Sequence, residues 1–295
     1  MRKLQNYKID TKNKYLLKDY KYGDKLPITS NTMMEVMFCN NRYIKYLKYL
    51  LELILKVKID NVTLIKNNID VSSIKDKKYK LDVVCLANDK ILNIEINSSS
   101  SESTLNRNFK YLSELFGSNI KCGSKKYLYK PTIQININNY SYKGYDEVID
   151  EFYIMNKNNI LYTDKVKIIN IYLGNIKKKI YNNSKLSEVE KLLLVMCEKE
   201  EREINLRKDN KIMEEYVRDA KKVSLNREIY TRFMTEEEYE DLINLEKEEI
   251  KEKSYILGEK KGVIKTAKKM LNKKLPIDII EECTGLKKNE INRLI

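Results

Sequence analysis

The sequence contains no histidine and no tryptophan. Without an imidazole, the chain has no means to build a Ser-His-Asp triad, a Cys-His dyad or a histidine-ligated zinc site. Its five cysteines are scattered singly through apolar runs and show no C-x-x-C spacing. This pattern predicts buried thiols in a reducing cytosol.

Glycine and proline are also scarce, with 8 and 3 residues in a chain of 295. The 42% of apolar and 34% of charged residues predict a globular, helix-rich chain with more than one structural unit. No stretch approaches the roughly 20 apolar residues that span a bilayer. The basic start MRKLQNYKID is not followed by the apolar segment of a signal peptide. We therefore expect a soluble cytoplasmic protein without a membrane partner.

Positive charge is present in excess. Lysine and arginine number 57 against 43 aspartates and glutamates, which gives a net charge of +14. Such a balance predicts an anionic partner, most often nucleic acid. The alternative is an AT-rich gene, because lysine, asparagine and isoleucine dominate while arginine is scarce. The charge by itself therefore gives only modest support for DNA binding.

The stretch from Tyr79 to Asn97 predicts a β-hairpin. Two apolar, β-branched runs flank a polar turn at Asn88-Asp89. A two-residue loop at this turn sets the register of the two strands. That register pairs Ala87 with Lys90, Val84 with Asn93, Asp82 with Glu95, and Lys80 with Asn97.

Two carboxylates therefore face each other across the predicted hairpin. Directly opposed residues have Cβ atoms about 4.5–5.5 Å apart, and like charges there destabilise the pair. A divalent cation such as Mg²⁺, which prefers carboxylate oxygens, would explain Asp82 opposite Glu95. A slip of one residue would move them to opposite faces, so an ordinary hairpin is the alternative.

Apolar periodicity predicts helices on both sides of the hairpin. The first runs from about Met33 to Val57, with Thr32 and Glu35 as a capping box. The second follows the hairpin, with Ser99 as a candidate cap. Its predicted buried stripe consists of Leu105, Phe109, Leu112 and Phe116.

Arg107 lies in this second helix, four residues before Tyr111 and on a different face from the apolar stripe. Because the helix leaves the Glu95 strand directly, it starts near the carboxylate pair. Arg107 is then placed to contact a phosphate bound there. A solvated arginine is the alternative.

Further strands are predicted on both sides of this region. Residues 61–69 alternate weakly. Pro131–Asn138 alternates cleanly, with isoleucines on one face and polar residues on the other. Val166–Leu173 predicts a more buried strand.

The chain divides into four predicted segments. These are an N-terminal arm (residues 1–28), an α/β core (29–175), a charged helical region (176–257) and a small helical tail (258–295). The charged helices predict solvated faces that serve as scaffold or as a surface for homo-oligomer formation.

The tail has the layout of a helix-turn-helix, with a tight turn at residues 284–286. Lys287, Lys288 and Arg293 would then face DNA. DNA-binding versions usually carry a small residue four positions before the turn glycine, where this chain has Glu281. A plain helical cap is therefore the alternative.

An aspartate on one strand, a turn, and Glu-x-(Lys or a substitute) on the next strand, followed by a helix, form the signature of PD-(D/E)XK nucleases. The chain resembles one branch, the recombination-promoting nucleases, also labelled PD-(D/E)XK nuclease family transposases. The resembling stretches lie within residues 27–138 and 258–295. They read ITSNTMMEVMF, KYKLDVV, LNIEIN, RNFKYLSEL, PTIQININ and GVIKTAKKMLNKKLPIDIIEECTGLKKNEI.

This resemblance implies an α/β, restriction-endonuclease-like core, a mixed sheet flanked by helices, with a mostly helical C-terminal half. It also implies Mg²⁺-dependent cleavage of DNA, with Mn²⁺ as a substitute cation. Asp82 and Glu95 would ligate the metal. Asn97 takes the position of the signature lysine, and Arg107 matches the arginine after the hairpin.

Two departures from the family pattern concern charge. Asn31 stands where an aspartate is common, so Glu35 is a third candidate metal ligand. Asn97 carries no cation, and the predicted register places Lys80 opposite it. We therefore interpret Lys80 as the residue that supplies the ammonium near the scissile phosphate.

The leading interpretation is a Mg²⁺-dependent DNA endonuclease linked to recombination or mobile elements. The alternative is a nuclease-fold protein that binds DNA or a protein partner with weak or no cleavage.

Overall fold

The computed structural model describes residues 8–10, 14–65, 81–98, 102–119, 129–199 and 206–294. The chain forms two compact units, residues 1–236 and 237–295. Within the described ranges, no helix is long and apolar enough to cross a membrane.

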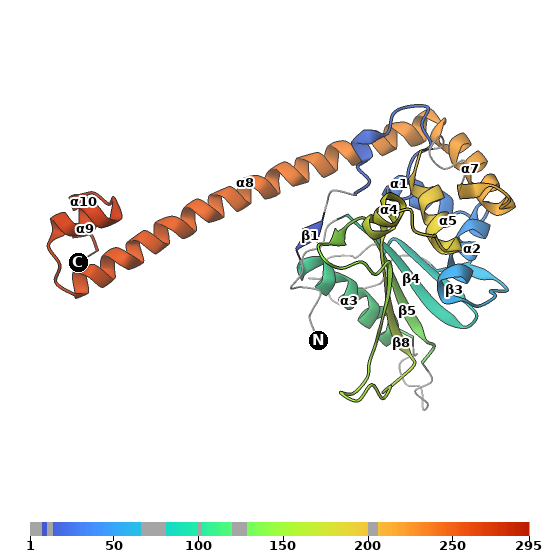
Figure 1. The fold of residues 1–295 in the computed structure, drawn as a ribbon, viewed down its shortest axis with the longest axis horizontal. Coiled ribbons are helices and arrows are strands. Elements are labelled where there is room, and N and C mark those ends of the chain that lie inside the picture. The colour runs from blue at the N-terminus through green and yellow to red at the C-terminus, as the bar shows by residue number, and fades with distance from the viewer. Residues whose placement is uncertain are drawn as a thin grey trace. The chain divides into compact units, whose positions relative to one another are not determined.

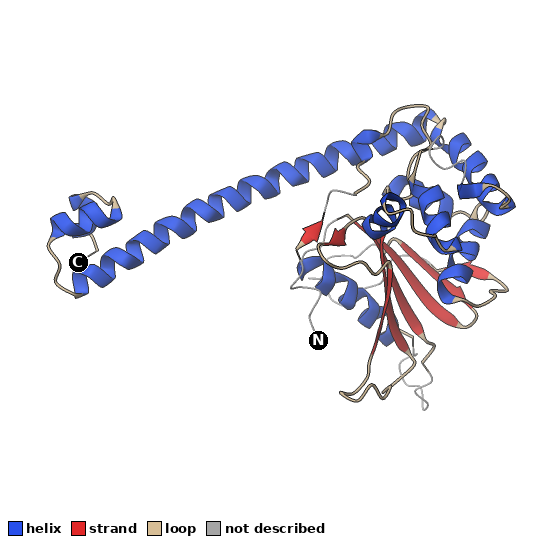
Figure 2. Cartoon of the chain, in the orientation of Figure 1, coloured by secondary structure: helices blue, strands red, loops and turns tan. Residues whose placement is uncertain are grey.

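A mixed six-stranded sheet forms the centre of the first unit (Figures 1 and 2). Its strands lie in the order β2-β3-β4-β5-β8-β7. The β4–β5 and β5–β8 pairs are parallel, and the others are antiparallel. The strand bounds are β2 Val62–Leu64, β3 Val83–Ala87, β4 Lys90–Asn97, β5 Thr132–Asn138, β7 Ile149–Tyr153 and β8 Val166–Tyr172. A separate two-stranded sheet joins β1 (Ile9–Asp10) to β6 (Ser141–Tyr142).

Helices flank the sheet, as the sequence predicts for an α/β core. The described helices of both units are η2 Leu17–Asp19, α1 Asn31–Phe38, α2 Ile44–Leu55, α3 Glu102–Gly117, α4 Leu173–Tyr181, α5 Glu188–Cys197, α7 Lys211–Ser224, α8 Arg227–Asn272, α9 Ile277–Thr284 and α10 Lys288–Asn292. The flanking helices are those of the first unit. Helix α3 connects the parallel strands β4 and β5, which need a crossover segment.

The two faces of the sheet differ in chemistry. One face is apolar and belongs to the main core with α1, α2, α5 and α7. Its buried side chains are Leu92, Ile94, Ile133, Ile135, Ile137, Ile169 and Ile171. The other face lies under α3, because Val84 on that face packs against Tyr111 and Leu115 of α3. Figure 1 shows α3 on one side of the strands and the other core helices on the opposite side.

The single helix predicted from Met33 to Val57 is wrong, because the chain forms α1 and α2 there. The Asn40 side chain accepts a hydrogen bond from the Arg42 backbone (2.9 Å), a local turn that competes with helix formation. The predicted Thr32 cap is also wrong. Ser30 is the N-cap, and its hydroxyl accepts from the Met33 backbone at 3.0 Å.

The buried stripe predicted for α3 is only partly correct. Leu112 is buried, but Phe109 is 62% exposed. The residues that α3 buries are Thr104, Asn108, Tyr111, Leu112 and Leu115. This face is more polar than the predicted stripe because it packs on the polar face of the sheet. The predicted Ser99 cap lies outside the described residues.

The strands predicted at Pro131–Asn138 and Val166–Leu173 are confirmed as β5 and β8. The weak strand near residues 61–69 is present as the short β2, and its remainder lies outside the described residues. The cysteine prediction is partly wrong. Cys85 and Cys197 are buried, whereas Cys283 is exposed.

The second unit consists of the later turns of α8 with α9 and α10. Ala267, Ile280 and Ile291, one from each helix, form its small core. Gly285 ends α9 in the left-handed conformation (φ 70°), which glycine adopts without a steric penalty. The predicted order of helix, tight turn and helix is confirmed in this segment.

Candidate active site

The β3–β4 hairpin holds the acidic pair that the sequence indicates. Asn88 and Asp89 both have positive φ (46° and 58°), as a two-residue type I′ turn requires. The observed register pairs Ala87 with Lys90, Val84 with Asn93, and Val83 with Ile94. The predicted register is therefore confirmed for the described strand pairs. The paired residues of β3 begin at Val83, and Asp82 lies directly before them.

Asp82 and Glu95 are joined through backbone groups of the opposing strand. Glu95 Oε1 accepts a hydrogen bond from the Asp82 backbone N–H at 3.2 Å. Asp82 Oδ2 accepts from the Ile96 backbone N–H at 3.0 Å. Each carboxylate is thus held next to the strand that carries the other.

Glu95 occupies an environment that disfavours its negative charge. Its side chain is only 2% exposed. Burial, followed by the charge of Asp82, raises the pKa of Glu95 to about 8, while the Asp82 backbone N–H, Asn93 and Arg107 oppose this rise. A divalent cation between the carboxylates would relieve both causes of the raised pKa.

Asn97, the last residue of β4, and Arg107 of α3 extend this site. Arg107 Nη2 donates to Asn97 Oδ1 at 3.0 Å, and Asn97 Nδ2 donates to Asn138 Oδ1 at 3.0 Å. The Arg107 guanidinium also lies 6.0 Å from the centre of the Tyr111 ring. A fixed cation therefore stands directly beside the position of the signature lysine. Lys80 lies outside the described residues.

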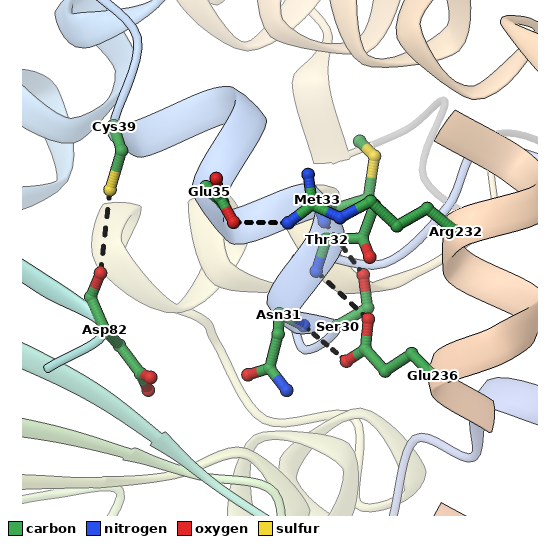
Figure 3. Close-up of polar contacts among 9 residues, drawn as sticks. All are labelled: Ser30, Asn31, Thr32, Met33, Glu35, Cys39, Asp82, Arg232 and Glu236. Carbon is green, nitrogen blue, oxygen red and sulfur yellow. Dashed lines mark hydrogen bonds and ion pairs between the residues drawn. The ribbon is translucent and has the colours of Figure 1, made fainter. Parts of the chain in front are cut away.

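Asn31 and Glu35 lie on α1, where their contacts lead to α8 (Figure 3). The Glu35 carboxylate forms an ion pair with Arg232 and points toward it and not toward Asp82. The Asn31 backbone N–H donates to Glu236 Oε1 at 2.6 Å, and the Thr32 N–H donates to Oε2 at 3.0 Å. α1 approaches the hairpin through Cys39, whose Sγ lies 3.6 Å from the Asp82 backbone oxygen.

The candidate DNA contacts of the tail belong to the second unit. Lys287, Lys288 and Arg293 are exposed, at or beside α10. Lys288 forms an ion pair with Asp278, and this contact raises its pKa. Lys287 and Arg293 flank α10 as its N-cap and C-cap residues.

Sequence reasoning missed two sets of residues that contact the predicted ones. Asn93 donates through Nδ2 to Glu95 Oε1 at 3.2 Å and to Gln134 Oε1 at 2.8 Å. The alternating polar positions of LNIEIN and TIQININ carried this signal, because residues two apart share a face of a strand. Arg232 and Glu236 gave no local signal, since their partners lie about 200 positions earlier in the chain.

The carboxylate oxygens of the acidic pair suit a hard cation such as Mg²⁺. Among the described residues, no group of three or more histidine, cysteine, aspartate or glutamate side chains could hold a metal. Asp82 and Glu95 supply two carboxylates. Mg²⁺ is commonly held by one or two carboxylates, retains several waters and binds substrate phosphates. Two carboxylates therefore fit a Mg²⁺ site that substrate oxygens complete.

Comparison with known protein families places this geometry in context. A family model described as PD-(D/E)XK nuclease family transposase matches residues 35–249. The matched range includes Asp82, Glu95, Asn97 and Arg107, and ends before the tail. A comparison with curated proteins finds no match.

Proposed function

The chain belongs to the PD-(D/E)XK nuclease family transposases and has their restriction-endonuclease-like α/β fold, and on that basis we propose that it is a Mg²⁺-dependent DNA endonuclease. The family relates it to nucleases of mobile elements. The observation that carries the proposal is the acidic pair, Asp82 and Glu95, held together at the end of the β3–β4 hairpin. The reaction is hydrolysis of a phosphodiester bond.

Asp82 and Glu95 would hold the cation through their carboxylate oxygens, with Mn²⁺ as a substitute for Mg²⁺. Mg²⁺ supplies Lewis acidity at a phosphate oxygen and makes water a stronger nucleophile at neutral pH. Glu95 takes part only as the carboxylate, so it releases its proton when the cation binds. The contact of Glu35 with Arg232 favours a site of two carboxylates without Glu35.

Arg107 is the candidate for the cation that Asn97 lacks. The hydrogen bond from Arg107 to Asn97 holds the guanidinium at the carboxylate pair. A guanidinium donates several N–H groups in a fixed plane and suits phosphate oxygens. Arg107 would orient the scissile phosphate and stabilise the negative charge that develops on it. Lys80 is the second candidate for the same role.

The second unit supports DNA as the partner. Residues 258–294 contain ten basic and five acidic residues. Lys287, Lys288 and Arg293 would contact phosphates in a sequence-independent way. The charged helix α8 is proposed as a surface for self-association.

The neutral residues Asn31 and Asn97 favour a second candidate function. A nuclease-fold protein with reduced charge at its site would bind DNA, or a protein partner, without cutting. Nicked DNA distinguishes the two functions, because only the endonuclease produces it.

The test is nicking of supercoiled plasmid with Mg²⁺ or Mn²⁺, measured beside retention of the same DNA on a filter. We expect metal-dependent nicking that falls to background in Asp82→Ala and in Glu95→Ala, while DNA retention persists. Arg107→Ala should lower the rate by about 10²–10³-fold, the loss typical of one transition-state donor. Lys80→Ala is compared with Arg107→Ala, because only the side chain that stabilises the charge on the phosphate should show this loss of rate when it is removed. Retention without nicking in the wild type would support the binding protein instead.

A further inference from the structure

A connected row of buried amides begins at Glu95 and crosses the sheet. We call Asn93, Gln134, Asn136 and Asn170 the amide ladder. After the Asn93–Gln134 bond, Gln134 Nε2 donates to Asn136 Oδ1 at 2.8 Å. Asn136 Nδ2 then donates to Asn170 Oδ1 at 2.8 Å. The ladder thus takes alternate steps along a strand and across to the next one, from β4 through β5 to β8.

The ladder ends at Tyr172, whose hydroxyl lies 3.3 Å from Asn170 Nδ2. All four amides are buried, with exposed fractions from 0% to 8%. Tyr172 itself packs among other tyrosines. The ladder is therefore anchored in packed side chains at the end that lies away from Glu95.

Packing does not demand amides at these positions. The opposite face of the same strands is built from isoleucine and leucine. A buried amide stabilises a fold only if its polar atoms find partners, and a buried polar network is often less favourable than apolar packing. A row of amides directly behind a candidate metal ligand therefore indicates a role in the site.

The ladder fixes which atom of Asn93 faces Glu95. The Gln134 amide points its nitrogen toward Asn136 and its oxygen toward Asn93. Asn93 must therefore present its nitrogen, and the same nitrogen reaches Glu95 Oε1. The Asn93 oxygen is buried without a hydrogen-bond partner among the described residues. An unpaired buried oxygen is costly, and this orientation is held by the two acceptors that Asn93 Nδ2 faces, Gln134 Oε1 and Glu95 Oε1.

The two oxygens of Glu95 consequently differ. Oε1 accepts from the Asp82 backbone N–H and from Asn93. No hydrogen bond within the described part of the chain reaches Oε2. Hydrogen bonds from outer residues orient ligands in this way at many metal sites.

We propose that Asn93, oriented by the amide ladder through Gln134, is a positioning residue that holds Glu95 Oε1 and leaves Oε2 for the divalent cation. This inference rests on the proposed metal-dependent function. It assigns Asn93 a direct contact with the ligand and Gln134 an indirect one. Loss of either amide should therefore weaken binding of the cation.

The test measures the dissociation constant of Mn²⁺ by electron paramagnetic resonance on the full chain without DNA. Asn93→Leu should weaken binding about 10–100-fold, the usual range for loss of an outer partner of a ligand. Gln134→Met, which keeps the volume but removes the oxygen, should weaken it by a smaller factor. Gln134→Glu, protonated in this buried site, retains an acceptor for Asn93 and a donor for Asn136. It should restore affinity close to that of the wild type.

A control separates positioning from stability. Asn175 is a buried amide of α4 that donates to the Glu147 backbone, away from the ladder. Asn175→Leu should lower the melting temperature and leave Mn²⁺ affinity unchanged. Wild-type affinity in Gln134→Met, and in Asn93→Leu if it folds, would overturn the positioning role. If the wild type binds no Mn²⁺, or if Glu95→Gln binds it equally well, the metal site itself is wrong.

Discussion

Glu95 is a carboxyl group in surroundings that favour its neutral form. It is buried, and the charged Asp82 lies beside it, so its pKa rises to about 8 from an ordinary value of 4.5. Without metal, the protein therefore loses stability at neutral pH by burying this carboxyl group, which is ionised in the unfolded chain. Such a trade between stability and function is common in active sites.

We expect Glu95→Gln to be more stable than the wild type at about pH 8 by on the order of 2–4 kcal/mol. The folded-state pKa is above the unfolded value, so the wild type loses stability as the pH rises from about 4.5 to about 8. Glutamine keeps an oxygen for the Asp82 N–H and has no proton to lose. Below about pH 4.5 the two proteins should be similar in stability.

Urea denaturation across this pH range, without divalent metal, measures the difference. Glu259→Gln removes an exposed carboxylate of α8 and should show no such pH-dependent gain. An equal stability of Glu95→Gln and wild type at about pH 8 would contradict the assigned environment of Glu95.

At the residue scale, the sequence predicts strand residues better than their side-chain contacts. Alternation and the Asn88-Asp89 turn were sufficient to predict the register of β3 and β4. The contact between Asn93 and Gln134 is not predicted, because β5 is separated from β4 by the whole of α3. The alternation of polar residues indicates one polar face on each strand, but it does not indicate which of these residues form hydrogen bonds across the sheet.

At the element scale, α1 is held by the first turns of α8. Helices begin with backbone N–H groups that have no partner within the helix. In α1, Ser30 satisfies one of them, and the Glu236 carboxylate satisfies those of Asn31 and Thr32. Arg232 of α8, one helical turn before Glu236, forms an ion pair with Glu35 of α1. The two side chains form a clamp between α8 and α1 (Figure 3).

Glu236→Ala should lower the free energy of unfolding by about 1 kcal/mol, the usual cost of a lost helix cap. Amide hydrogen exchange at Asn31 and Thr32 should become faster. Glu236→Gln should retain part of the effect, since one amide oxygen can still accept. Glu259→Ala, a loss of charge elsewhere on α8, is the control. Unchanged exchange at both amides in Glu236→Ala would show that the clamp does not protect α1.

The helices are predicted from apolar periodicity, and the details that are wrong concern features that apolar spacing does not encode. Apolar spacing does not detect a local turn such as that of Asn40, which separates α1 from α2. Spacing also cannot choose between two faces of a helix. In α3, the face that packs on the sheet carries Asn108 and Tyr111, whereas Phe109 is exposed. The polar face of the sheet decides this choice.

At the scale of the whole molecule, the net charge of +14 favours contact with DNA. The tail offers residues that differ in their present partners. Lys288 is paired with Asp278, whereas Lys287 and Arg293 carry no ion pair within the described residues. The latter two are therefore better placed to bind phosphates.

The double variant Lys287→Glu and Arg293→Glu should weaken DNA binding. The slope of log K against log salt concentration should become less steep, by the amount expected for the loss of about two phosphate contacts. Asp278→Asn should instead strengthen binding, because it releases Lys288. Fluorescence anisotropy with a labelled duplex at several salt concentrations measures both changes. If the double variant binds with unchanged affinity and slope, the tail is a helical cap without a role in DNA binding.

In the proposed nuclease, Asp82 and Glu95 together hold the divalent cation. Anomalous diffraction from crystals grown with Mn²⁺ and a DNA duplex would locate this cation. The predicted result is an anomalous peak bonded to carboxylate oxygens of both residues, with Glu35 still paired to Arg232. A peak bonded to neither carboxylate, or none at this site beside ordered DNA, would contradict the claim.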